Sequence, residues 1–211
     1  MLRKLFALVF VAGFATGCAV GQKIDYSQQY SSIPTIAQGT TLSLGVQDLR
    51  PYVISGKKEA NFVGVQRGGY GNPFDVTTTS GRPLAEDLLQ TFTNTFRSAG
   101  TVVTGTTLAS SLSPEMAVTT LSEKGSERIL YISFKEWKSD SFANSWVIYD
   151  VTARIYDRNG KMLGQNHLQG KDAISSSAAM AKSDANNSIT QAFQQKIKDL
   201  LGGPEIIAAL Q

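Results

Sequence analysis

The first 18 residues of this chain indicate which part of the sequence folds and in which compartment. Two positive charges, Arg3 and Lys4, precede an apolar run over residues 5–14, and small residues then lead to Cys18. A charged start, a short apolar stretch and a small-residue cleavage site are typical of a secretory signal peptide. The run is too short for a membrane span, which takes about 20 apolar residues. We therefore predict that residues 1–17 are a signal peptide and take no part in the folded domain.

Cys18 is the only cysteine of the chain, so an exported domain cannot use it for an internal disulfide. The stretch Ala15-Thr16-Gly17-Cys18 resembles the lipobox of bacterial lipoproteins. The resemblance implies cleavage between Gly17 and Cys18 and acylation of the cysteine, and several acyl chains are enough for stable membrane attachment. Lipoboxes usually carry leucine where this chain has Ala15. An ordinary signal-peptidase site, and a soluble secreted protein with a free N-terminal cysteine, therefore stay open.

The residue that follows Cys18 is Ala19 and not aspartate. By resemblance to the sorting rule of Gram-negative lipoproteins, this favours the outer membrane, with the protein on its periplasmic face. Residues 18–39 are largely polar, and we interpret them as the lipidated cysteine followed by a flexible tether. Residues 40–211 are long enough for a single periplasmic domain with a sizeable core.

The composition argues against several classes of function. Removal of Arg3 and Lys4 with the signal lowers the formal net charge from +3 to +1, and no basic cluster points to nucleic acid. The single histidine, His167, is not accompanied by a serine in a Gly-x-Ser-x-Gly turn. One histidine and one cysteine do not make a zinc site. We predict no catalytic residues, no metal and no cofactor, and hence no enzyme.

Helical spacing marks two main helices. Leu84, Leu88, Phe92 and Phe96 lie four apart and form an apolar stripe, with Gly100 after the last turn. A similar stripe predicts a helix over about 176–201. A shorter helix is expected from Ser113, a good capping residue, to about residue 124.

Alternating apolar residues predict the strands. Residues 41–46 read as a half-buried strand, and residues 101–104 as a brief β-prone run. Residues 128–137, 145–156 and 161–170 read as a three-stranded meander with a tight turn near Asn159 and Gly160. This order favours an α+β two-layer sandwich, with a mainly antiparallel sheet covered on one face by the two main helices.

The lipobox, the tether, an early strand ending in Asp48-Leu49-Arg50 and the order of the later elements together resemble the YajG-like family of uncharacterised bacterial outer-membrane lipoproteins. The resemblance spans nearly the whole mature chain. It implies a place in the cell envelope and supplies no reaction. From the residues alone, we interpret Asp48 and Arg50 as a local ion pair that holds a turn.

The stretch from Arg67 to Phe74 is the most unusual in the chain, with three glycines, a proline and two aromatic residues. It lacks the Gly-Lys-Ser/Thr ending of a phosphate-binding loop. It is either a plain hairpin loop or a contact loop in which Tyr70 and Phe74 are anchors and Arg67 is a polar partner.

Three further aromatic residues gather around the tip that joins two meander strands. They either cover one end of the core or form a binding patch: Trp137, Phe142 and Trp146.

These observations predict a non-enzymatic binding or assembly module. It is attached to the membrane by its lipid anchor, and its partner is an envelope protein or polymer. Two alternatives remain: a structural subunit of a secretion or surface-appendage complex, and an envelope hydrolase whose carboxylates only the fold brings together.

Overall fold

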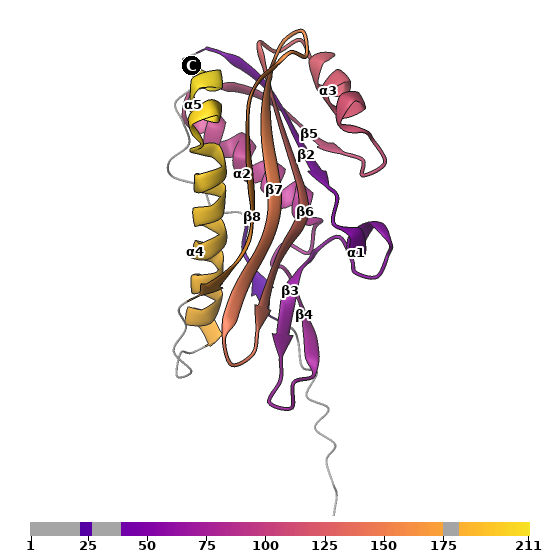
Figure 1. Ribbon diagram of the computed structural model, residues 1–211, viewed down its shortest axis with the longest axis vertical. Coiled ribbons are helices and arrows are strands. Elements are labelled where there is room, and N and C mark those ends of the chain that lie inside the picture. Colours follow the sequence, from indigo (N-terminus) through magenta and orange to yellow (C-terminus); the bar gives the residue numbers. More distant parts are fainter. Residues whose placement is uncertain (1–21, 27–38, 175–181) are drawn as a thin grey trace, which may run out of the picture.

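The computed structural model describes residues 22–26, 39–174 and 182–211 (Figure 1). The predicted signal peptide, Gly17, Cys18 and most of the predicted tether lie outside these ranges. No helix among the described residues is both long and apolar enough to cross a bilayer.

Eight strands and five helices make up the described part of the chain. The strands are β1 (Lys23–Ile24), β2 (Thr41–Asp48), β3 (Phe62–Arg67), β4 (Pro73–Thr78), β5 (Val102–Leu108), β6 (Arg128–Ser141), β7 (Ser145–Asp157) and β8 (Met162–Ile174). The helices are α1 (Pro51–Ile54), α2 (Leu84–Ser98), α3 (Pro114–Ser122), α4 (Lys182–Leu201) and α5 (Pro204–Leu210).

All eight strands join one curled sheet, and the predicted mainly antiparallel two-layer sandwich is wrong. Along the sheet the order is β1-β4-β3-β6-β2-β5, and β7 and β8 continue from β6. Four strand pairings are parallel, namely β1–β4, β2–β5, β2–β6 and β3–β6. Only three, β3–β4, β6–β7 and β7–β8, are antiparallel. The sheet is therefore mixed, and its helices lie over its two sides instead of forming one covering layer (Figure 1).

The two parallel neighbours of β2, strands β5 and β6, follow each other in the chain and are connected by helix α3. A strand that follows a helical crossover returns parallel to its neighbour, whereas a tight turn reverses the direction. Helix α3 carries the chain from β5 across to β6, so these two strands run in the same direction on either side of β2. The meander β6–β7–β8 was predicted correctly because two tight turns connect its strands.

The central strand β2 is buried on both faces, although its alternating pattern predicted a half-buried strand. Its apolar side chains belong to the main core, into which α2 and α4 also pack. On the opposite face α3 lies so close that a Cβ at Gly45 would stand 2.6 Å from Leu121 Cδ1. Gln47 on the same face donates hydrogen bonds to the carbonyls of Ala109 and Leu112 at 2.7 and 3.0 Å. These partners explain how the amide of Gln47 is tolerated in a buried strand.

The helices follow their sequence signals closely. The apolar stripe of α2, from Leu84 to Phe96 at four-residue spacing, is buried as predicted. The side chain of Ser113 accepts a hydrogen bond from the amide of Met116, which confirms it as the cap of α3. Helix α4 packs its apolar stripe, which includes Phe193, on β7 and β8.

Part of the predicted tether belongs to the folded domain. Lys23 and Ile24 form β1, which pairs with Thr77 and Thr78 of β4. Ile24 and Tyr26 are buried, and the ring of Tyr26 lies 5.7 Å from that of Phe193 in α4. Residues 22–26 are therefore held by the sheet and the core.

Strand β6 connects the two halves of the sheet. Its first half, residues 128–134, pairs with β2, and a bulge then shifts its register before residues 139–141 pair with β3. Strands β2 and β3 thus lie end to end along the same side of β6. The chain between them leaves the sheet over residues 49–61 and includes α1. This segment carries the buried polar network around Arg50.

Candidate functional site

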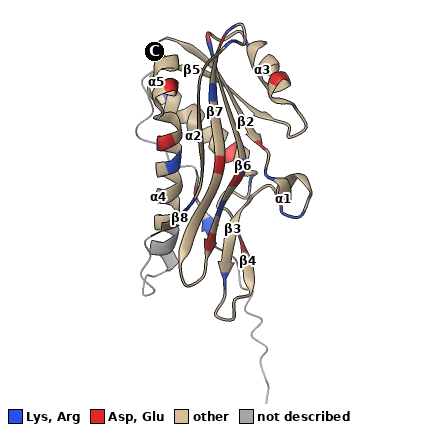
Figure 2. Ribbon diagram, in the orientation of Figure 1, with Lys and Arg blue, Asp and Glu red and all other residues tan. Residues whose placement is uncertain are grey.

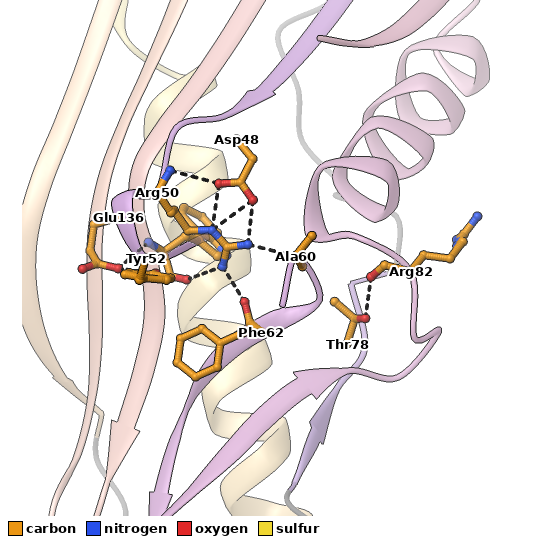
Figure 3. A network of polar contacts seen from close by, with 9 residues as sticks. Asp48, Arg50, Tyr52, Ala60, Phe62, Thr78, Arg82 and Glu136 are labelled. Atoms are coloured by element: carbon orange, nitrogen blue, oxygen red, sulfur yellow. Dashed lines mark hydrogen bonds and ion pairs between the residues drawn. The ribbon is translucent and has the colours of Figure 1, made fainter. Parts of the chain in front are cut away.

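Arg50 is the most buried charged side chain in the described ranges, with none of its surface exposed. Its Nη2 lies 2.7 Å from Asp48 Oδ2 and donates to the carbonyl of Ala60 at 3.0 Å. Its Nη1 donates to the carbonyl of Phe62 (Figure 3). The guanidinium thereby joins the end of β2 to the start of β3. The expected ion pair between Asp48 and Arg50 is confirmed.

The electrostatics of Arg50 suit a structural link. Burial acts to lower its pKa, but the hydrogen bond and negative charge of Asp48 outweigh burial, so the pKa lies above its ordinary value. A guanidinium that stays charged neither gives up nor takes a proton. The Asp48–Arg50 pair can therefore hold backbone carbonyls in place, and it does not supply acid–base chemistry.

Tyr52 extends this network toward the surface. Its hydroxyl donates to Glu136 Oε1 at 2.5 Å, and Lys138 Nζ lies 2.7 Å from Glu136 Oε2. Burial raises the pKa of Tyr52, and the hydrogen bond with Glu136 adds to the shift. The phenol is thus held as a hydrogen-bond donor, which fixes α1 against β6.

The three residues of the predicted contact loop share one hairpin but do not converge on one point. Arg67 ends β3, and its Nη2 lies 3.1 Å from Asp140 Oδ2 on β6. Phe74 lies in β4 and is half-buried, while Tyr70 at the turn is fully exposed. Gly71 takes a left-handed backbone angle, with φ of 79°. The stretch is therefore an ordered hairpin that presents a single aromatic side chain, Tyr70, at its tip.

The three meander aromatics also separate. Trp137 is fully buried and stacks on Phe193 with ring centroids 4.7 Å apart, which fits the prediction of a core cover. Phe142 is 59% exposed at the β6–β7 turn. Trp146 lies half-buried on the opposite face of the sheet from α4, with Lys171 Nζ 4.7 Å from its ring centroid. Only Trp137 covers the core. Phe142 and Trp146 lie at and next to the β6–β7 turn.

His167 lies on β8, and its Nε2 is 2.9 Å from Asp150 Oδ1 on β7. Half of the His167 side chain is exposed. This cross-strand pair lies on an open sheet face. Among the described residues, no group of three or more His, Cys, Asp or Glu side chains is placed to hold a metal ion.

A groove that the sequence did not predict lies between α2 and β5. The groove is shallow, with a volume of about 470 Å³. Its lining on the helix side includes Leu89, Thr93 and Arg97. On the strand side its lining residues are Gly105 and Thr107. A Cβ at Gly105 would stand 2.8 Å from Thr93 Oγ1, so glycine lets the strand approach the helix this closely.

The outer edge of β5 runs along this groove. Within the described ranges β5 pairs only with β2, and the amide of Val102 donates to the carbonyl of Thr40 on that side. Backbone groups alternate in direction along a strand, so the N–H and C=O of Val103, Gly105 and Thr107 point away from β2. Arg97 Nη2 already donates to the carbonyl of Val103 at 2.9 Å. The groups of Gly105 and Thr107 face the groove.

Charged residues of both signs occur throughout the described part of the chain. Figure 2 shows acidic and basic residues interspersed along the strands and helices in this view. Many form cross-strand or helix–strand pairs, such as Lys196 with Asp172 at 2.5 Å.

The comparisons with known proteins support a shared fold and no closer relationship. No family model matches the chain, and no curated protein matches it. Among solved structures, a Xanthomonas campestris protein described by the family model DUF330 matches with a TM-score of 0.50 at 12% identity, over 90% of this chain and 93% of that one.

Two further structures match less closely. A hypothetical protein of Chlamydia trachomatis matches with a TM-score of 0.47 at 12% identity, over 82% of this chain and 98% of that one. A lipoprotein of Neisseria meningitidis matches with a TM-score of 0.37 at 12% identity, over 76% of this chain and 99% of that one. The neighbours thus include a bacterial lipoprotein, while nothing in them is specific to the YajG-like family.

Proposed function

We propose that this chain is a lipid-anchored protein on the periplasmic face of the outer membrane. Its domain binds an extended segment of an envelope protein and catalyses no reaction. The lipobox ending in Cys18, followed by Ala19, supports the anchor and its location. The outer edge of β5 beside α2 is the observation that carries the binding function.

An edge strand next to a helix is a recurring site for strand addition. An extended peptide pairs with the free backbone groups, and its alternate side chains contact the groove. Here Leu89 supplies an apolar surface, and Arg97 and Glu86 supply charges of both signs. A peptide with an apolar residue flanked by polar ones matches this lining.

The number of free backbone groups on β5 also limits how tightly an added strand can bind. Gly105 and Thr107 offer two amides and two carbonyls, and each hydrogen bond contributes about 1 kcal/mol net. Four such bonds correspond to weak binding, on the order of millimolar. Attachment of both partners to one envelope raises the effective concentration, so such an interaction can still hold them together.

The test uses a photo-crosslinking residue at the exposed position 104 of full-length protein in its native envelope. Thr107→Pro removes the outward amide and leaves the pairing with β2, because proline is tolerated at the free edge of a strand. Thr107→Val keeps the amide and is the matched control. We expect one envelope protein to be crosslinked in the wild type and in Thr107→Val, and to be lost in Thr107→Pro. Identical adducts in both variants would refute binding at this edge.

The same outer edge favours a second candidate, in which a further copy of this chain adds to β5 and builds a structural subunit of a larger assembly. Crosslinks from position 104 would then join two copies of the chain. Mass spectrometry of the crosslinked peptides distinguishes the two candidates directly.

A further inference from the structure

The first strand of the folded domain begins only a few residues after Cys18. Described residues begin at Gln22, and Lys23 and Ile24 already pair with β4. Four residues span at most about 14 Å, even when fully extended. A lipid on Cys18 would therefore keep the domain near the membrane surface instead of lifting it away on a long tether.

The direction of β1 tells which end of the domain faces Cys18. Strand β1 is parallel to β4, which starts at Pro73 directly after the β3–β4 turn. Gln22 therefore lies on the side of Lys23 that points toward this turn. Lys23 is level with Thr77, and the five residue-to-residue steps from Thr77 back to Asn72 span roughly 17 Å of strand. Cys18 is also five residues from Lys23, so its reach matches the level of the turn.

A second hairpin tip lies at the same end of the domain. Strand β3 runs parallel to β6, with Gln66 level with Ser141. The β6–β7 turn follows Ser141 at once, so both turns lie at one end, at the bottom of Figure 1. The amide of Phe142 donates to the carbonyl of Asn144 at 3.0 Å and closes the second turn.

Exposed aromatic side chains mark this end. Tyr70 is fully exposed on one turn, and Phe142 is 59% exposed on the other. Trp146 lies four residues beyond Phe142, next to the Lys171 ammonium. Tyrosine and tryptophan are enriched where a protein meets the interface of a bilayer, and a nearby lysine can extend its charge to the headgroups. We call Tyr70, Phe142 and Trp146 together with Lys171 the tip surface.

We propose that the tip surface rests on the lipid bilayer that holds Cys18, with Tyr70 and Phe142 inserted into the headgroup region. This inference rests on the lipid anchor of the proposed function and adds the orientation of the domain. The short reach from Cys18 and the aromatic residues at the same end are independent observations that point to one occupant, a lipid surface.

This orientation leaves the β5 groove free. Strand β5 is on the side of β2, which pairs with the first half of β6, and the tip surface adjoins the far end of β6. The seven residue-to-residue steps from Phe134 to Ser141 span roughly 23 Å. A partner segment can therefore reach the groove from the periplasm while the tips contact lipid.

The test places an environment-sensitive fluorophore on single cysteines of full-length, lipidated protein. Cys18 is acylated in this protein, so Tyr70→Cys and Phe142→Cys each carry the only free thiol. Asn159→Cys is the control, because it lies exposed on the β7–β8 turn at the opposite end of β7. The proteins are reconstituted in vesicles of phosphatidylethanolamine and phosphatidylglycerol, with and without lipids that carry a quencher at the headgroup level.

We expect the labels at positions 70 and 142 to shift to shorter wavelength and to be quenched, and the label at position 159 to be unaffected. Equal, weak quenching at all three positions would overturn the inference, provided that the protein floats with the vesicles. A wavelength shift at positions 70 and 142 without quenching by the labelled lipids would also overturn it, because a second copy or another protein would then cover the tips. Intact mass and flotation test the anchor separately: an unacylated protein that does not float refutes the proposed anchor itself.

Discussion

The buried guanidinium of Arg50 allows a sharp test of what holds the two halves of the sheet together. Asp48→Asn removes the negative charge next to Arg50 and changes the size of the side chain little. The carbonyls of Ala60 and Phe62 still accept hydrogen bonds from the guanidinium. The substitution therefore leaves a fully buried positive charge without a counter-charge.

The expected loss follows from the burial of the pair. Breaking a buried ion pair by removing one partner costs about 3–5 kcal/mol. The side chain of Asp48 is 14% exposed, so water can partly replace it, and we place the loss near the lower end, at about 3 kcal/mol. With a urea slope of roughly 2 kcal/mol/M, the unfolding midpoint should fall by about 1.5 M.

Urea unfolding followed by tryptophan fluorescence is a suitable assay. Trp137 is buried beside the network, and its carbonyl lies 3.5 Å from Arg50 Nη1. The matched control is Asp75→Asn, which removes a carboxylate from the half-exposed pair with Lys58. Exposed pairs contribute at most about 1 kcal/mol. If Asp48→Asn lowers the midpoint no more than Asp75→Asn does, Arg50 is not the link that the geometry indicates.

Three further predictions concern other parts of the sheet. Gly64→Ala should lower the free energy of unfolding by about 1–3 kcal/mol, because a Cβ there would stand 2.7 Å from a carbonyl oxygen of β6. The control is Gly69→Ala, where a Cβ meets nothing within 4 Å, and it should change the urea midpoint little. The hydrogen bond from Lys196 lowers the pKa of Asp172, so this carboxylate stabilises the fold above its unfolded pKa of about 4 and loses that contribution as the pH falls further. The free energy of unfolding should therefore fall less steeply with acid in Asp172→Asn than in the wild type. An unchanged pH profile would contradict the assignment. Burial raises the pKa of Tyr52, so the ultraviolet absorbance titration of Tyr52→Phe should match the wild type up to about pH 11; a smaller amplitude near pH 10 would show that the phenol ionises normally.

The elements that the sequence predicted well depend on neighbours within a few residues. The apolar spacing of α2, the Ser113 cap of α3 and the tight turn at Gly160 between β7 and β8 are all local. Gly160 alone takes a positive φ in that turn, of 79°. The ion pair of Asp48 and Arg50 was also predictable, because the two residues are only two positions apart.

The candidate site was only partly predictable. The β3–β4 hairpin and its exposed Tyr70 follow from the glycine-rich stretch, but the separation of Arg67 toward Asp140 depends on the pairing of β3 with β6. The groove beside β5 was missed, because residues 101–104 read only as a brief run and its helix partner is defined by packing. Gly105, between threonines, was the one local signal of a strand that approaches another element closely.

The sequence alone specifies the local elements and places its one cysteine three small residues beyond a short apolar run. The pairing of the strands follows only from the tertiary structure. This pairing sets the fold class, buries β2 on both faces and holds residues 22–26 against β4 and the core. The reason is that these pairings join residues far apart in the chain. An alternating pattern shows which side chains of a strand share a face, and it does not show which strand lies alongside or whether a second helix covers the other face.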